Sequence, residues 1–194
     1  MLKFIETLKN IWTIDELKNR ILITLFFLVI YRLAAQVVLP GVDYNIISDA
    51  QIAGGGGLLG LLNAFTGGAF ANASVVALGI MPYISASIVV QLMGVALPYL
   101  QKLQKEGESG RKKITQITRW LTIGICVVQA PAYLYGLGAL GVPDSAFVLG
   151  KGPFFIIPSV IILVTGCIFA MWLGEKITDR GIGNGISLLI TVGI

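Results

Sequence analysis

Apolar residues divide the chain into long hydrophobic runs separated by short polar segments. Four runs are long enough for a membrane-spanning helix, which needs about 20 apolar residues; they cover 21–39, 74–97, 120–140 and 154–174. A fifth apolar run, 186–194, reaches the end of the sequence after about half that length. The pattern predicts an all-α polytopic membrane protein with four full transmembrane helices and a truncated fifth.

One uncharged stretch, from Ala50 to Gln101, is interrupted by glycines before its transmembrane run begins. Gly54 to Gly57 are consecutive, and a short apolar piece follows them. Unpaired backbone groups in hydrocarbon cost several kcal/mol each, so irregular backbone at membrane depth must be sheltered by protein or water. We therefore expect residues 54–72 to form a glycine hinge and a short re-entrant helix in a cavity, with apolar residues at helical spacing: Leu58, Leu59, Leu61, Leu62 and Phe65.

Composition supports a membrane protein and excludes several kinds of catalytic site. The chain has 194 residues, of which 56% are hydrophobic and 12% charged, whereas soluble domains carry about 25% charged residues. It has no histidine, which excludes Ser-His and Cys-His nucleophile pairs and His-ligated zinc. Cys126 and Cys167 lie in different apolar runs and are most simply packing residues. We predict that the chain is not an enzyme and has no cofactor or metal site.

Basic residues predict the orientation. Four Lys and Arg precede the first run, six lie in 98–119 and two in 175–185, so 12 of the 14 share one side if the runs alternate. The positive-inside rule makes that side cytoplasmic, together with the N-terminus. Residues 1–20 then read as an interfacial helix, with a signal peptide as the alternative. Arg32, inside the first run, is expected to snorkel toward the outer surface.

Several residues within or beside the runs form short patterns that do not by themselves assign a role. Four isoleucines pair at a spacing of four residues, which by itself favours core or lipid-facing positions; they are Ile80, Ile84, Ile186 and Ile190. Uncharged polar residues at membrane depth are consistent with ordinary hydrogen bonds between helices; they are Ser85, Ser87, Gln91 and Gln129. The glycines from Gly181 to Gly185 follow no strand and predict a tight turn, with Asn184 near a helix N-cap.

Three longer motifs, in this order and with these loops between them, resemble the amino-terminal half of the SecY family of protein-conducting channel subunits. They are FTGGAFANASVVALGIMPYISASIVVQL, KEGESGRKKITQITR and MWLGEKITDRGIGNGIS. The resemblance extends from about Ile21 to Ile194. It implies a multi-pass protein of the bacterial inner membrane, with a pore for unfolded secretory preproteins and a lateral exit for apolar helices into the lipid bilayer.

The resemblance also implies roles for particular residues. The short piece after the glycines becomes a plug, the four isoleucines contribute to an apolar pore ring, and the second and third runs form one side of a lateral gate that holds the four polar residues. The cytoplasmic loops would face the motor ATPase SecA or the ribosome through Lys105, Arg111, Lys112, Lys113 and Arg180. The implied membrane partners are the small subunits SecE and SecG.

Members of this family have ten spans in two halves of inverted topology. This sequence stops within the fifth, so we expect it to need the carboxy-terminal half of the channel. A secondary transporter with broken helices around a midplane cavity is the alternative. That hypothesis predicts a charged residue at midplane, and Ala50 to Gln101 contains none.

Overall fold

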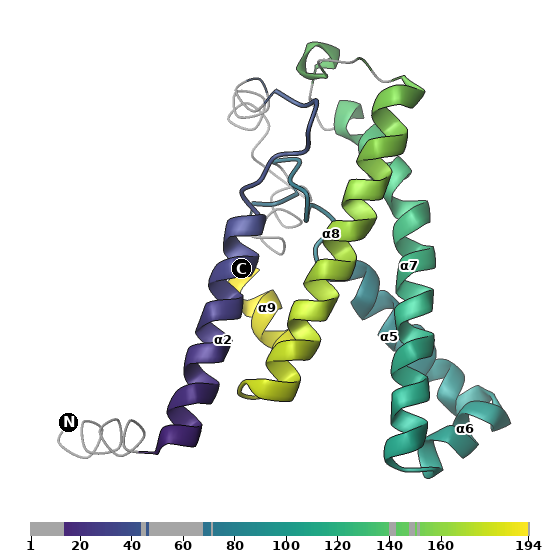
Figure 1. The fold of residues 1–194 in the computed structure, drawn as a ribbon. Helices are drawn as coiled ribbons and strands as arrows, with labels where there is room; N and C mark the ends of the chain where they lie inside the picture. Colours follow the sequence, from purple (N-terminus) through teal and green to yellow (C-terminus); the bar gives the residue numbers. More distant parts are fainter. Residues whose placement is uncertain are drawn as a thin grey trace.

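The computed structural model describes residues 14–43, 46, 68–70, 72–139, 143–147, 150 and 152–193. This part of the chain is helical, with two isolated β-bridges, which confirms the all-α class. The helices are α2 (Asp15–Ala34), α5 (Met81–Ala96), α6 (Pro98–Lys105), α7 (Glu108–Ala139), α8 (Pro153–Arg180) and α9 (Gly185–Gly193), with a 3-10 turn at Asp144–Ala146. In Figure 1, α2, α8 and α7 run lengthwise, and the short α9 lies between α2 and α8.

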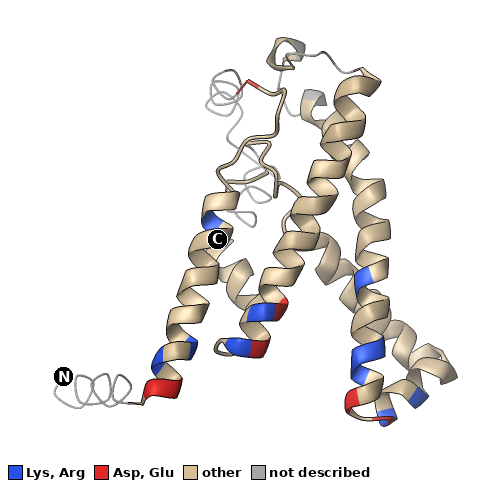
Figure 2. Ribbon diagram, viewed as in Figure 1, with Lys and Arg blue, Asp and Glu red and all other residues tan. Residues whose placement is uncertain are grey.

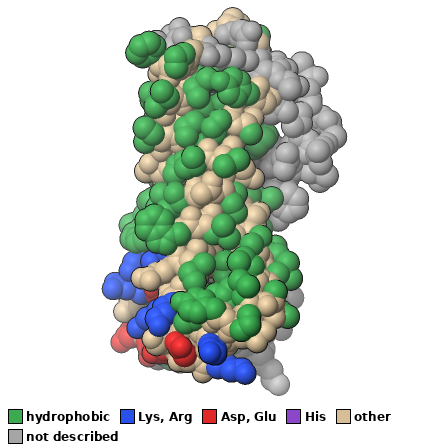
Figure 3. All heavy atoms as spheres, turned by 90° about the vertical axis from the view of Figure 1, so that its right-hand side faces the viewer, with side chains coloured by type: hydrophobic (Ala, Val, Ile, Leu, Met, Phe, Trp, Pro, Cys, Tyr) green, Lys and Arg blue, Asp and Glu red, His purple; other side chains and the backbone are tan. Residues whose placement is uncertain are grey.

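Membrane-spanning length is clearest for two helices. Within the described ranges, α7 and α8 are each long and apolar enough to cross a membrane. Helices α5 and α6 pass the same test together, although the chain bends by 100° between them. Figure 3 shows hydrophobic side chains over most of one face, with charged side chains gathered at one end. By length and composition, the described part therefore holds two candidate spans, or three if the bent pair is one.

The second span begins later than the sequence suggested. Residues from Ser74 to Ile80 form turns, and α5 starts at Met81. Their backbone is held by the segment after α2, because Val75 N donates to Val37 O at 2.9 Å and Leu39 N donates to the Ala73 carbonyl at 2.8 Å. Gly79, at φ +54°, also departs from helical geometry just before α5. The prediction of a continuous helix over 74–97 was wrong in this first part.

The first span is displaced relative to the predicted 21–39. Helix α2 already begins at Asp15, so the end of the predicted interfacial helix 1–20 belongs to it, while residues 1–13 lie outside the described residues. It ends at Ala34, after which the chain turns and Val38 forms a bridge with Ser74. Pairing with this distant segment, which has no local sequence signal, ends the helix early.

The two charged segments, 98–119 and 175–185, are largely helical, contrary to their prediction as loops. Residues 98–119 contain α6 and the first turns of α7, and α8 continues through 175–180 to Arg180. Lys, Arg and Glu are good helix formers, so charge marks exposure to water rather than a break in the helix. Gly107, at φ +71°, lies between α6 and α7, and Leu100 and Leu103 of α6 are buried.

The two larger of three buried apolar clusters in the described residues form most of the core. The distal cluster lies at the end away from most charges and joins α7, α8 and the turn segments; its buried members include Leu39, Leu78, Tyr133, Leu137, Phe155 and Leu163. The isoleucine cluster joins α2, α5, α8 and α9 around the buried residues Tyr31, Ile80, Ala170, Leu173, Ile177 and Leu189.

Candidate functional site

The four isoleucines singled out from the sequence meet in one cluster. Ile80 is a buried member of the isoleucine cluster, and Ile84, Ile186 and Ile190 pack against it while partly buried. They come from the start of α5 and from α9, segments about a hundred residues apart in the sequence. The fold thus brings together the complete set predicted to contribute to a pore ring, although that role stays a prediction.

Gly174 of α8 is a point of close approach within this cluster. A Cβ atom at this position would lie 3.1 Å from Ile186 Cγ1, 3.3 Å from Leu189 Cδ1 and 3.5 Å from Ile80 Cδ1. A hydrogen at position 174 therefore lets both isoleucine-bearing segments pack against the same turn of α8.

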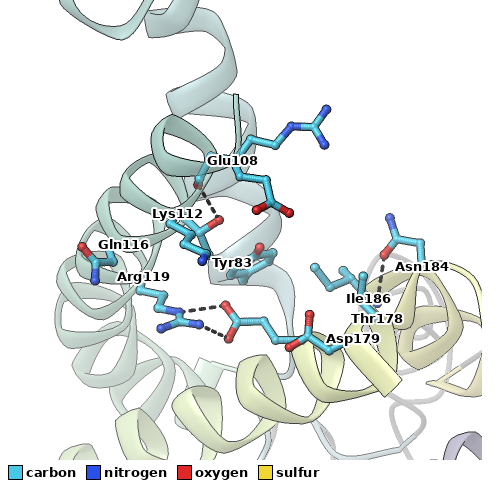
Figure 4. Close-up of a pocket in the computed structure, with 12 residues that line it drawn as sticks. Tyr83, Glu108, Lys112, Gln116, Arg119, Thr178, Asp179, Asn184 and Ile186 are labelled. Atoms are coloured by element: carbon cyan, nitrogen blue, oxygen red, sulfur yellow. Dashed lines mark hydrogen bonds and ion pairs between the residues drawn. The ribbon is translucent and has the colours of Figure 1, made fainter. Parts of the chain in front are cut away.

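A polar cleft of about 630 Å³ opens beside the isoleucine cluster. Its walls come from the first turns of α7, the end of α8 and the start of α9, with Tyr83 of α5 between them (Figure 4). It carries charges of both signs: Arg111, Lys112 and Arg119 with Glu108, Glu175 and Asp179. Ile186 lines the cleft and also packs in the isoleucine cluster, so the cleft borders that cluster.

An ion pair joins α7 to α8 across this cleft. Arg119 Nε donates to Glu175 Oε1 at 2.8 Å, and its Nη2 donates to Oε2 at 2.5 Å, as the dashed lines in Figure 4 show. The Glu175 side chain is 16% exposed and that of Arg119 is 46% exposed. Two hydrogen bonds fix the orientation of the guanidinium relative to the carboxylate as well as their separation. The pair therefore holds α7 and α8 together at the wall of the cleft.

The predicted gate residues lie on α5 and α7, and three of them are exposed. Ser85, Gln91 and Gln129 are exposed and Ser87 is half-buried. Gln91 Nε2 donates to Ser87 Oγ at 3.3 Å, a contact within α5. The polar side chains are thus available to groups outside the described residues rather than forming the α5–α7 contact.

The predicted docking residues are exposed at the charged end of the molecule. Lys105 ends α6, Arg111 to Lys113 lie at the start of α7, and Arg180 ends α8. Figure 2 shows basic and acidic positions gathered at this end, where α2 begins and α8 ends. Lys113 Nζ lies 3.7 Å from Glu106 Oε2, a pair exposed to water.

Of the segment 54–72, predicted to form the glycine hinge and plug, the structure describes only 68–70 and 72, as turns; the predicted plug side chains lie outside the described residues. This applies to Leu58, Leu59, Leu61, Leu62 and Phe65, and also to the glycine hinge from Gly54 to Gly57.

Neither the Arg119–Glu175 ion pair nor the place of Tyr83 in the cleft is predicted from the sequence. The available sequence signal was that two opposite charges border neighbouring apolar runs: Arg119 directly precedes 120–140, and Glu175 directly follows 154–174. The expected cap was found: Asn184 Oδ1 accepts from Ile186 N at 3.1 Å, which places Asn184 at the start of α9.

The family model and the relatives found by comparison with known proteins agree on one family. A family model described as SecY matches residues 74–194. The protein translocase subunit SecY of Haemophilus influenzae is 45% identical over 92% of this chain and 40% of its own length. That of Escherichia coli K12 is 43% identical over 93% of this chain and 41% of its own length. The chain therefore spans about two fifths of these curated relatives.

Two solved structures share the fold. One, described as the structure of a protein conducting channel, has a TM-score of 0.58 and 23% identity, covering 91% of this chain and 36% of its own. The other, Sec61 in a canine ribosome-channel complex, has a TM-score of 0.57 and 22% identity, covering 91% of this chain and 36% of its own. Neither these structures nor the two relatives are named as secondary transporters, so that alternative gains no support.

Proposed function

The chain belongs to the SecY family, and on that premise we propose that it forms the first half of a channel that passes unfolded secretory proteins across a membrane and releases apolar helices into lipid. The observation that carries the proposal is the convergence of Ile80, Ile84, Ile186 and Ile190 at the inner end of a polar cleft. Ile186 belongs to both features, so a chain entering through the cleft would meet these side chains next.

An isoleucine constriction suits a channel that admits many sequences. A narrow apolar passage excludes water and therefore ions, while branched side chains pack against any polypeptide without a specific hydrogen bond. Because Ile84, Ile186 and Ile190 are only partly buried, they keep surface that further parts of a ring, or a passing chain, would cover. The proposed role is transport, with the energy supplied by a partner.

We assign one wall of a lateral gate to α5 and α7. The outward side of α5 combines exposed apolar residues, such as Ile88 and Leu92, with exposed Ser85 and Gln91. Such a surface can meet another helix and part from it again, because its polar groups exchange partners with water or with a passing chain. Leu58, Leu59, Leu61, Leu62 and Phe65 are assigned to a plug on the outer side.

The whole architecture would contain four complete spans and the start of a fifth, with the remaining ring and gate residues supplied by a carboxy-terminal half. The complete spans would be α2, α7, α8 and the segment 74–97, which contains α5, and α9 would begin the fifth. This arrangement corresponds to the first of two inverted repeats.

Charge distribution supports an orientation with the N-terminus in the cytoplasm of a bacterial cell, the chain lying in the inner membrane. The start of α2, the α6–α7 turn and the end of α8 bring charged residues to one end. There Lys105, Arg111, Lys112, Lys113 and Arg180 would receive SecA or the ribosome by charge. SecE and SecG would be the small membrane partners.

The test uses site-specific photocross-linking in the full-length protein that contains this chain. A photoreactive amino acid replaces Ile84 or Ile190, and a secretory precursor is stalled during transport. The matched control replaces Ile161, which is 61% exposed on α8 and outside the isoleucine cluster. We expect cross-links to the precursor from positions 84 and 190 and none from 161. Equal yields from all three positions, or none from 84 and 190 while transport proceeds, would contradict the proposal.

A further inference from the structure

The turn between α8 and α9 is held by two threonine hydroxyls from different helices. Ile182 N donates to Thr24 Oγ1 of α2 at 3.1 Å, and Gly185 N donates to Thr178 Oγ1 of α8 at 2.9 Å. Thr24 is buried and lies 158 residues from its partner in the sequence. The turn is thus tied at both ends.

Each hydroxyl is oriented by its own helix. Thr24 Oγ1 donates to Arg20 O at 2.8 Å, and Thr178 Oγ1 donates to Gly174 O at 2.9 Å. A hydroxyl has one proton and two lone pairs, so donating that proton along the helix leaves the oxygen free only to accept. Both oxygens therefore present a fixed acceptor to the backbone of the turn.

The glycines of the turn allow this close contact. A Cβ atom at Gly181 would lie 2.4 Å from Thr24 Oγ1, and one at Gly185 would lie 2.1 Å from Gly174 O. Neither separation is compatible with a side chain at these positions. The glycine-rich sequence is thus explained by approach to α2 and α8, in addition to the positive φ of +70° at Gly183.

Helix α9 depends on this turn for its position. It begins at Gly185, directly after the turn. It carries Ile186 and Ile190 of the isoleucine cluster, and Ile186 follows Gly185 directly. A displacement at the turn would therefore move both isoleucines.

We propose that Thr24 and Thr178 are positioning residues for the pore constriction: their hydroxyls clamp the α8–α9 turn and so set where Ile186 and Ile190 meet Ile80 and Ile84. The proposal rests on the proposed function, because it assumes that the isoleucine cluster seals the channel. Helix α2 contributes none of the four isoleucines, but through Thr24 it would help to keep the constriction closed.

The test compares four variants of the full-length protein in liposomes. Thr24→Val keeps the branched shape of the side chain but removes the hydroxyl oxygen that accepts from Ile182 N. Thr24→Ser keeps a hydroxyl at this position. Thr122→Val is the matched control, because Thr122 is fully buried and its hydroxyl donates only to Thr118 O of its own helix. Ile186→Ser perturbs the constriction directly. The readouts are resting ion leak and amide hydrogen exchange in residues 181–186.

Thr24→Val should raise leak and exchange about fivefold, the population change equivalent to the ~1 kcal/mol of one neutral hydrogen bond. In Thr24→Ser and Thr122→Val, both leak and exchange should stay near the values of the unmodified protein.

If Ile186→Ser leaks while Thr24→Val changes neither leak nor exchange, the proposed role of the threonines is refuted and the constriction stands. If Ile186→Ser itself does not leak, the proposed function fails. A leak in Thr122→Val equal to that in Thr24→Val would also refute the clamp, since it would reflect a general loss of packing.

Discussion

The distal cluster and the isoleucine cluster are built differently. The distal cluster packs buried leucines and alanines with aromatic rings: Phe147 and Phe155 have centroids 5.4 Å apart, and Tyr133 Oη donates to Phe70 O at 2.6 Å. The isoleucine cluster has a smaller buried centre, and most of its isoleucines are only partly buried. The distal cluster has the larger fully buried centre, whereas the isoleucine cluster presents partly buried isoleucines beside a polar cleft. We infer that the first stabilises the fold and the second forms a contact that can open.

The largest effect on stability should therefore come from the distal cluster. Leu163 is 1% exposed there, and Leu163→Ala should lower the free energy of unfolding by about 2–4 kcal/mol, since it leaves a cavity in a closed core. Thermal unfolding of the full-length protein in detergent measures this.

Ile190→Ala is the matched change in the isoleucine cluster, where Ile190 is only partly buried. It should cost clearly less stability and raise ion leak instead. If Ile190→Ala destabilised the protein as much as Leu163→Ala and caused no leak, the distinction between the two clusters would be lost.

A smaller effect is expected at the cleft beside the isoleucine cluster. Arg119→Gln or Glu175→Gln removes the ion pair between α7 and α8, and because the arginine is nearly half exposed, the pair should contribute only about 0.5–1 kcal/mol. A double-mutant cycle on unfolding isolates this contribution and should show it shrinking as salt is added. Additive effects of the two substitutions would mean that the two charges do not brace the wall.

The difference between the clusters also shows what the sequence could reveal. Helices α7 and α8 follow from hydrophobic runs, and the cap at Asn184 follows from local turn chemistry. The four isoleucines were selected through helical spacing and the family resemblance, and the fold brings them together. Each of these signals lies within a short stretch of sequence.

The misplaced features depend on contacts between distant segments. The late start of α5 at Met81 reflects backbone bonds from the segment around Ser74 to the segment around Val38, and the Thr24 bond joins α2 to a turn far along the chain. The charged segments are predicted as loops because they separate the apolar runs. Hydropathy reports depth in the membrane, but exposed Lys and Glu continue a helix as well as apolar residues do.

The central claim is that the isoleucine cluster seals the channel, and ion leak tests it most directly. In the full-length protein, serine replaces Ile80, Ile84, Ile186 and Ile190 together, and resting conductance is recorded in planar bilayers beside an Ile157→Ser and Ile161→Ser control on the exposed face of α8. Polar side chains allow water to enter a narrow apolar passage, so we predict a large conductance in the fourfold variant and none above background in the control. A fourfold variant that folds, transports precursor and conducts no more than the control would contradict the account.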